Sequence, residues 1–138
     1  MTKAAENSAR LRSFAEAYTD AWCSRDAARV ASFYEADGSL GVNDAAPAVG
    51  REAIATVAQG FMTAFPDMQV LFDELRLEDG GAVYHWTLTG MNTGPGGTGR
   101  AVRISGHEVW QIGAGGLIAR SRGHFDAEDY RRQLEAGE

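Results

Sequence analysis

Asp126 is the carboxylate best placed for chemistry, because it lies between a strand predicted over residues 117–125 and a helix predicted over residues 127–134. A carboxylate at the rim of an apolar cavity has its charged form desolvated, so its pKa rises toward a range useful for proton abstraction. An aspartate at this point can equally cap the helix by accepting a backbone N–H. The residues by themselves favour the cap.

Alternation along the same strand places His124, Arg122 and Arg120 on the face that Asp126 shares. If that face lines a pocket, Arg122 could hold an anionic group or stabilise an enolate oxygen, since its charge would lie where negative charge develops. A solvent-facing side chain or an ion pair with Asp126 is the alternative for Arg122. For Arg120 the solvent-facing position is favoured.

Two further histidines, His107 and His85, lie on neighbouring predicted strands, where either could donate a proton. The histidines include no pair four residues apart on a helix, and there is no Cys-x-x-Cys, so no metal site is expected. The glycine-rich stretch 94–99 precedes a strand rather than a helix, which argues against a phosphate loop. No cofactor is expected.

The first half of the chain has the 3.6-residue period of amphipathic helices. It predicts a helix around residues 11–22, a second from an Asp26 cap to Asp37-Gly38, and a third from Gly50 to Pro66. The second half alternates with period two and predicts strands over 68–77, 82–90, 100–112 and 117–125. Helices followed by antiparallel strands predict one α+β domain over residues 1–138, in which a curved sheet is covered by the helices on its concave face.

Aromatic and other apolar side chains at these positions could serve both as core and as the wall of a pocket. They are Phe14, Tyr18, Trp22, Phe61, Met62, Trp86 and Trp110. The hydroxyl of Tyr18 would need a hydrogen-bond partner if it were buried.

Composition narrows the class of partner. The 138 residues carry a formal charge of −6 and no cluster of basic residues, which argues against nucleic acid. Cys23 is the only cysteine, so no intramolecular disulfide can form. No secretory signal and no membrane span are recognisable, and a cytoplasmic protein is expected.

The order of several short motifs resembles that of the SnoaL-like polyketide cyclases of the NTF2-like superfamily. The motifs are Tyr18 to Asp26, Phe33 to Gly38, Gly50 to Ile54, Trp86 to Gly90, Gly94 to Arg100, Gly116 to Ile118, Asp126, and Gln133-Leu134. The resemblance implies an NTF2-like cone with three N-terminal helices packed on a curved, mainly antiparallel sheet. It also implies that Asp126, eight residues before Leu134, matches the family's general base. With this match, a catalytic role and a capping role for Asp126 are about equally supported.

The resemblance has consequences for other positions too. Asn92 stands where the family often has a histidine, so the resemblance does not determine the identity of the substrate. Ketosteroid isomerases are similar in the first helix, where Tyr18 matches their hydrogen-bonding tyrosine, but Val42 falls where their base would be. In the family, the third and fourth long strands of the sheet often border the pocket, which favours His107 over His85 as a site residue. A homodimer through the outer sheet face is expected, with Trp110 and Ile112 on the side opposite His107.

Three functions remain open. The first is an acid–base enzyme that acts on a hydrophobic, polyketide-like carbonyl compound by aldol cyclisation or isomerisation. Asp126 would be the base, Tyr18, His107 or Arg122 would stabilise the enolate, and Asn92 and His124 would join the apolar residues in substrate binding. The second is an epoxide-hydrolase-like enzyme in which Asp126 activates water and Arg122 orients it. The third is a non-catalytic module for small-molecule binding or dimerisation.

Overall fold

The computed structural model describes residues 3–43, 45–78 and 80–135. Its helices are α1 (Lys3–Cys23), α2 (Ala27–Ala31), α3 (Arg51–Ala64) and α4 (Ala127–Glu135). Its strands are β1 (Tyr34–Val42), β2 (Ala48–Val49), β3 (Gln69–Glu78), β4 (Gly81–Met91), β5 (Ala101–Ile112) and β6 (Ile118–Phe125).

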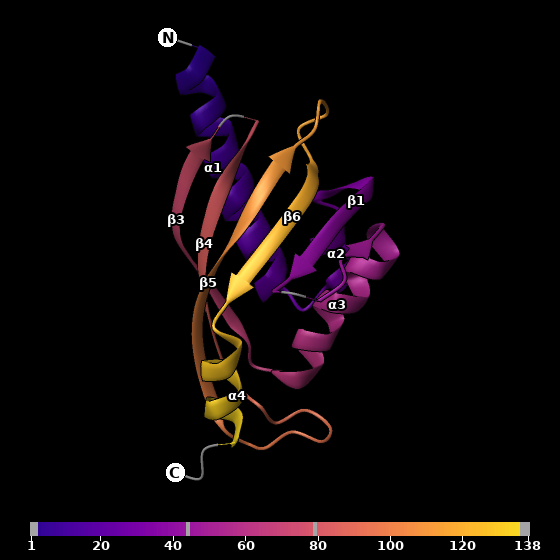
Figure 1. The fold of residues 1–138 in the computed structure, drawn as a ribbon, viewed down its shortest axis with the longest axis vertical. Helices are drawn as coiled ribbons and strands as arrows, with labels where there is room; N and C mark the ends of the chain where they lie inside the picture. The colour runs from indigo at the N-terminus through magenta and orange to yellow at the C-terminus, as the bar shows by residue number, and fades with distance from the viewer. Residues whose placement is uncertain (1–2, 44, 79, 136–138) are drawn as a thin grey trace.

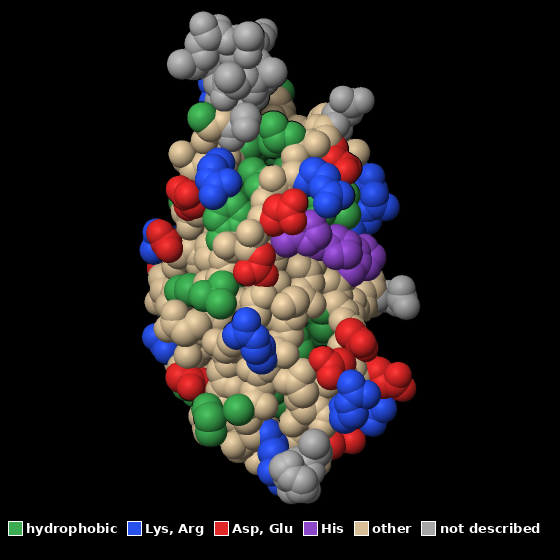
Figure 2. Space-filling view, turned by 90° about the vertical axis from the view of Figure 1, so that its left-hand side faces the viewer, with side chains coloured by type: hydrophobic (Ala, Val, Ile, Leu, Met, Phe, Trp, Pro, Cys, Tyr) green, Lys and Arg blue, Asp and Glu red, His purple; other side chains and the backbone are tan. Residues whose placement is uncertain are grey.

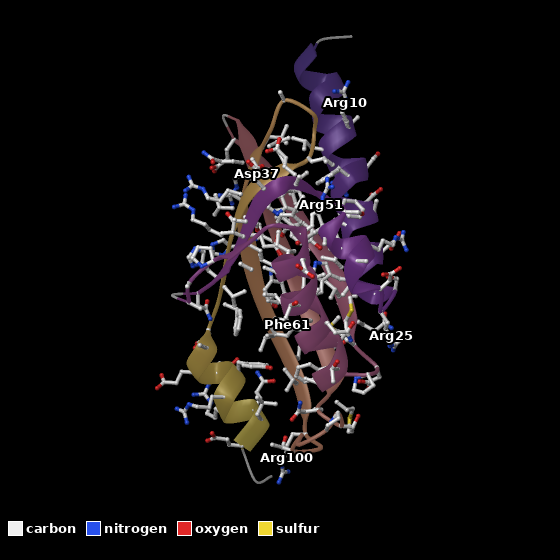
Figure 3. The ribbon with its side chains drawn as sticks, turned by 90° about the vertical axis from the view of Figure 1, so that its right-hand side faces the viewer. Arg10, Arg25, Asp37, Arg51, Phe61 and Arg100 are labelled. Carbon is white, nitrogen blue, oxygen red and sulfur yellow. The ribbon has the colours of Figure 1, made fainter. Side chains whose placement is uncertain are left out.

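The six strands form one sheet in the order β2-β1-β6-β5-β4-β3. Neighbouring strands are antiparallel except β1 and β6, which run parallel. The sheet curves, and α1, α2 and α3 lie against one face while α4 extends beyond the end of β6 (Figures 1 and 3). The predicted α+β cone, with three helices on a curved and mainly antiparallel sheet, is confirmed. No helix in these described ranges is long and apolar enough to cross a membrane.

The second helix is shorter than the sequence predicts. Asp26 caps it as expected, since its side chain accepts the backbone N–H of Arg29 at 3.2 Å. The helix ends at Ala31, however, and the residues predicted to continue it form β1. Tyr34 is fully buried and pairs with Ile118 of β6. Pairing with a distant strand therefore outweighs the local helical pattern, a contribution that periodicity cannot reveal.

The assignment of the two sheet faces is also corrected. Trp110, expected on the outer face, is 2% exposed and packs toward the helices. Its ring stacks on Tyr84 with centroids 5.0 Å apart and meets the ring of Tyr18 edge-on at 5.3 Å. His107 lies on the opposite, outer face of β5. A homodimer through the outer face of the sheet stays a prediction, but Trp110, expected on that face, lies on the covered one.

The outer face carries a row of histidines from three adjacent strands. His85, His107 and His124 occupy paired positions on β4, β5 and β6. Their ring centroids are 5.7 Å and 5.1 Å apart along the row, which Figure 2 shows on the surface among acidic and basic side chains. The row therefore lies across the sheet from the helices.

Candidate functional site

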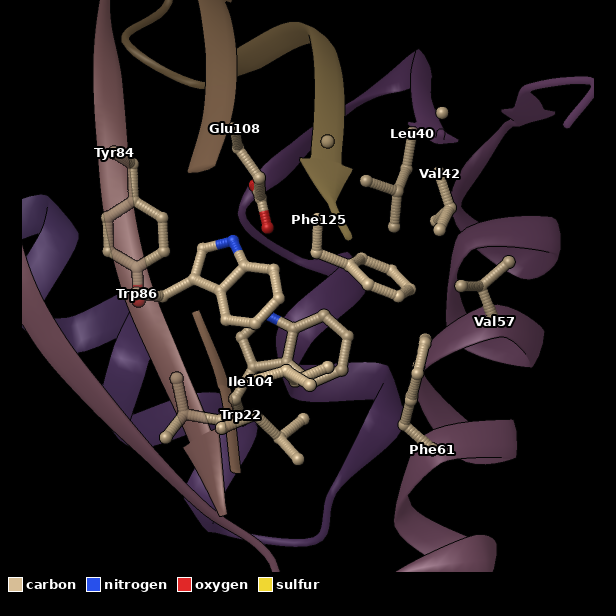
Figure 4. Close-up of a pocket in the computed structure, with 14 residues that line it drawn as sticks. Trp22, Leu40, Val42, Val57, Phe61, Tyr84, Trp86, Ile104, Glu108 and Phe125 are labelled. Atoms are coloured by element: carbon tan, nitrogen blue, oxygen red, sulfur yellow. The ribbon is translucent and has the colours of Figure 1, made fainter. Parts of the chain in front are cut away.

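An apolar cavity lies between the sheet and helices α1 and α3 (Figure 4). The cavity has a volume of about 60 Å³, several times the minimum that one water molecule needs. It is lined by residues of α1, α3 and five strands: Trp22, Leu40, Gly41, Val42, Val57, Phe61, Val70, Tyr84, Trp86, Leu88, Ile104, Glu108, Gly123 and Phe125. The cavity therefore suits a small, mainly hydrophobic ligand.

Glu108 is the one carboxylate among these lining residues. It lies on the inward face of β5 and is 7% exposed. Its Oε1 accepts hydrogen bonds from Trp110 Nε1 at 2.8 Å, from Ser121 Oγ at 2.9 Å and from the Tyr18 hydroxyl at 3.0 Å. Its Oε2 has only a longer contact, 3.3 Å, with the same Tyr18 hydroxyl. The carboxyl group points into the cavity, so Oε2 is the oxygen left to exchange a proton with a ligand (Figure 4).

Two buried tyrosines extend this network behind Glu108. The hydroxyls of Tyr18 and Tyr34 are 2.8 Å apart. Because the single hydroxyl proton of Tyr18 is donated to Glu108, the hydroxyl of Tyr34 must donate to Tyr18. Burial, and then the nearby Glu108 charge, raises the pKa of both tyrosines well above the usual value. Both hydroxyls are therefore neutral donors that hold the carboxyl group in place.

Burial raises the pKa of Glu108 above its usual value of 4.5. Hydrogen bonds from Trp110, Ser121 and Tyr18 act in the opposite direction, because they favour the charged carboxylate. The balance is a carboxyl group that stays neutral to higher pH than an exposed glutamate. Because its pKa is raised, the carboxylate form of Glu108 is a stronger base than an exposed glutamate, which suits general acid–base catalysis.

This pKa predicts how stability changes with pH. The neutral carboxyl is the form that folding favours, so its contribution is fully present below about pH 4.5, the usual pKa, and is lost as the pH rises through the raised pKa. We therefore expect the difference in the free energy of unfolding, wild type minus Glu108→Gln, to decrease as the pH rises from about 4.5 through the raised pKa. Denaturant titrations at several pH values measure this difference. A difference that is constant with pH would contradict the raised pKa.

Comparison with known proteins gives the family. The family described as SnoaL-like polyketide cyclase matches residues 12–134. The chain belongs to this family. The resemblance found in the sequence motifs is thereby confirmed. A search of curated proteins found no match.

Solved structures share the fold of this SnoaL-like protein. A protein described as a SnoaL-like polyketide cyclase from Jannaschia sp. CCS1 has a TM-score of 0.80 at 14% identity, with 94% of each chain covered. TsrD from Streptomyces laurentii has a TM-score of 0.79 at 21% identity, covering 93% of this chain and 96% of that chain. A protein with a ketosteroid isomerase-like fold from Catenulispora acidiphila, solved with trimethylamine, has a TM-score of 0.77 at 13% identity, covering 88% and 91%.

Several of the predicted site residues meet at this cavity in the SnoaL-like chain. Trp22, Phe61 and Trp86 line it, and Tyr18 donates directly to Glu108. The other predicted apolar residues, Phe14, Met62 and Trp110, belong to the packed core and do not line the cavity. Trp110 still serves the site through its hydrogen bond to Glu108.

Asp126 lies elsewhere. Its side chain is exposed, and its Oδ1 accepts the backbone N–H of Asp129 at 3.0 Å, so it caps α4. The nearby Gln133 side chain bonds both the backbone N–H and the carbonyl of Arg103, at 2.7 Å and 3.0 Å, and docks α4 on β5. The spacing of Asp126 and Gln133 thus has a structural explanation in this SnoaL-like protein. The catalytic role of Asp126 stays a prediction.

The polar residues predicted beside Asp126 lie on the outer face of the sheet. His107 and His124 border a surface hollow there together with Asp126, and Arg122 and Arg120 are exposed. The pKa of His107 is lowered by partial burial, and then by the neighbouring His124 and His85. These side chains are thus separated from the apolar cavity by the sheet.

Asn92 holds a loop together. Its Oδ1 accepts the backbone N–H of Thr98 at 2.8 Å, and its Nδ2 donates to the carbonyl of Ala64 at 3.2 Å. These bonds tie the connection between β4 and β5 to the end of α3. Asn92 does not line the cavity.

Glu108 is the functional candidate that the sequence reasoning missed. Its strand offers a signal, because Val102, Ile104 and Trp110 share its alternating position and all three are buried. A glutamate in that series must face the core, where only a partner or a function explains it.

Proposed function

We propose that this SnoaL-like protein is an acid–base enzyme that acts on a small apolar carbonyl compound, with Glu108 as the proton acceptor. The observation that carries the proposal is the position of Glu108 at the wall of an apolar cavity, with Oε1 occupied by three donors and Oε2 left with only the longer contact to Tyr18. Membership of the SnoaL-like family supports the same class of reaction.

The proposed step is the removal of a proton from the carbon next to a carbonyl group. Glu108 Oε2 takes the proton, the electron pair of the C–H bond forms the C=C bond of an enolate, and the carbonyl π pair moves onto oxygen. The enolate carbon can then attack a second carbonyl carbon, whose alkoxide recovers the proton from Glu108. Alternatively, where the substrate carries a C=C bond in the β,γ position, the enolate is conjugated with it, and Glu108 returns the same proton to the γ carbon while the carbonyl group re-forms. The first course is an aldol cyclisation, and the second is an isomerisation.

The hydrogen bonds to Oε1 have two roles in this step. They fix the carboxyl group so that Oε2 keeps one orientation in the cavity. They also offset part of the effect of burial on the pKa of Glu108, so that the carboxylate form becomes accessible. Tyr18 is therefore a positioning residue, because its hydroxyl acts through Glu108.

The cavity favours this chemistry over epoxide hydrolysis. Opening an epoxide with water needs a base for the water and an acid for the leaving oxygen. Among the described lining residues, Glu108 is alone as a carboxyl group. A single base is sufficient for enolisation, because the same group removes and returns the proton.

Hydrogen–deuterium exchange tests the proposal without knowledge of the natural substrate. In D₂O, the protein should accelerate the exchange of the C2 hydrogens of 1-tetralone, an apolar ketone, relative to buffer and relative to an equal concentration of free glutamate. The rate is read by NMR as loss of the C2 proton signal. If 1-tetralone binds the cavity and its exchange is not accelerated, the protein is a binding module rather than an enzyme of this class.

A further inference from the structure

One buried polar atom at the cavity has no hydrogen-bond partner among the described residues. The indole Nε1 of Trp86 is buried, and no described residue accepts its hydrogen. Trp86 lines the same cavity as Glu108, and Figure 4 shows the nitrogen edge of its ring turned toward the Glu108 carboxyl group. An indole nitrogen can only donate, so a group that satisfies it must be an acceptor.

The backbone holds the Trp86 ring in this position. Trp86 pairs with Gly106 on β5, and a Cβ atom at position 106 would lie 2.6 Å from Cζ2 of the indole and 2.4 Å from the carbonyl oxygen of His124. Glycine is therefore required for the ring to lie across β5. The ring of Phe125 packs against the indole edge-on, with centroids 6.1 Å apart. These contacts hold the N–H group toward the cavity.

A buried donor without an acceptor costs free energy, and buried tryptophan N–H groups usually have a partner. We infer that Trp86 Nε1 donates a hydrogen bond to an oxygen of the ligand and thereby selects apolar ligands that carry a carbonyl group over hydrocarbons of the same shape. A water molecule can satisfy the donor until the ligand oxygen displaces it. This inference rests on the proposed function and names the feature by which its substrate is recognised.

The position of Trp86 also gives the bound ligand an orientation. With the ligand oxygen at Trp86, the carbon next to the carbonyl group lies beside the Glu108 carboxyl group, since the two side chains are turned toward one another on the cavity wall (Figure 4). As the proton leaves that carbon, negative charge develops on the oxygen that Trp86 contacts. A donor already in place stabilises this charge more than it stabilises the neutral carbonyl. Trp86 thus determines specificity and supports the reaction that Glu108 begins.

A matched pair of probes tests the inference by binding alone. 1-Tetralone and tetralin differ in a carbonyl oxygen, and NMR titrations give both affinities together with the indole ¹H–¹⁵N resonances. Wild type should bind 1-tetralone about tenfold more tightly than tetralin, an effect of one hydrogen bond. Trp86→Phe should lose that preference. Phe61→Leu is the control, because it enlarges the cavity as Trp86→Phe does but keeps the indole donor. It should weaken both affinities and keep the preference for 1-tetralone.

Each outcome separates the inference from the proposed function. An unchanged preference in Trp86→Phe, or equal affinities in wild type, would overturn the role of Trp86 whatever the exchange assay shows. A preference that depends on Trp86, without accelerated C2 exchange, would support the inference and contradict the enzymatic proposal. If neither probe binds the cavity, both the role of Trp86 and the proposed function are contradicted.

Discussion

Replacing Glu108 with glutamine should lower the rate of C2 exchange about 10²–10⁴-fold, the usual contribution of a positioned general base. Glutamine keeps the length of the side chain and an oxygen that can accept the hydrogen bonds of Trp110, Ser121 and Tyr18. It replaces the basic Oε2 with an NH₂ group that cannot accept a proton. The variant should therefore fold normally, by circular dichroism and thermal melting, and lose catalysis.

Asp126→Asn is the matched control, because it makes the same chemical change at the position that the family motif indicates. Asparagine caps helices as well as aspartate does, so α4 should remain docked. If the base is Glu108, Asp126→Asn should retain full exchange activity. Loss of activity in Asp126→Asn, with full activity in Glu108→Gln, would assign the base to Asp126. In wild type, the exchange rate should rise with pH through the raised pKa of Glu108, since only the carboxylate can take a proton.

Trp110→Ala should have the largest effect on stability, lowering the free energy of unfolding by about 3–5 kcal/mol. The side chain is 2% exposed and packs against Phe14, Tyr18 and Tyr84, so its removal leaves a cavity at the junction of α1 with β4 and β5. It also removes one of the three donors to Oε1 of Glu108. Urea titrations measure the loss.

Trp110→Phe separates the two effects. It retains an aromatic ring in the core and removes only the N–H donor, so it should cost less stability than Trp110→Ala. Because that hydrogen bond lowers the pKa of Glu108, its loss should move the rise of the exchange rate to higher pH. A loss below about 1 kcal/mol in Trp110→Ala would mean that the core can collapse around the missing ring.

Local sequence determined most of the elements of this protein. The spacing of apolar residues predicts α1 and α3, Pro66 marks the end of α3, and glycine-rich turns separate the strands of the second half. Asp126 follows the same logic, because a helix cap depends on residues within one turn. These features depend on contacts between near neighbours, which a single sequence displays.

Only the tertiary structure decided which residues meet at the site. Residues from Tyr34 onward form β1 instead of extending α2, because β6 supplies a partner strand. The choice of inner face on β5 puts Glu108 and Trp110 inside and His107 outside, and alternation alone cannot say which of the two faces is covered. The donors to Glu108 come from α1, β5 and β6, and the open donor of Trp86 comes from β4. Such a site depends on contacts between residues far apart in the chain, which folding alone brings together.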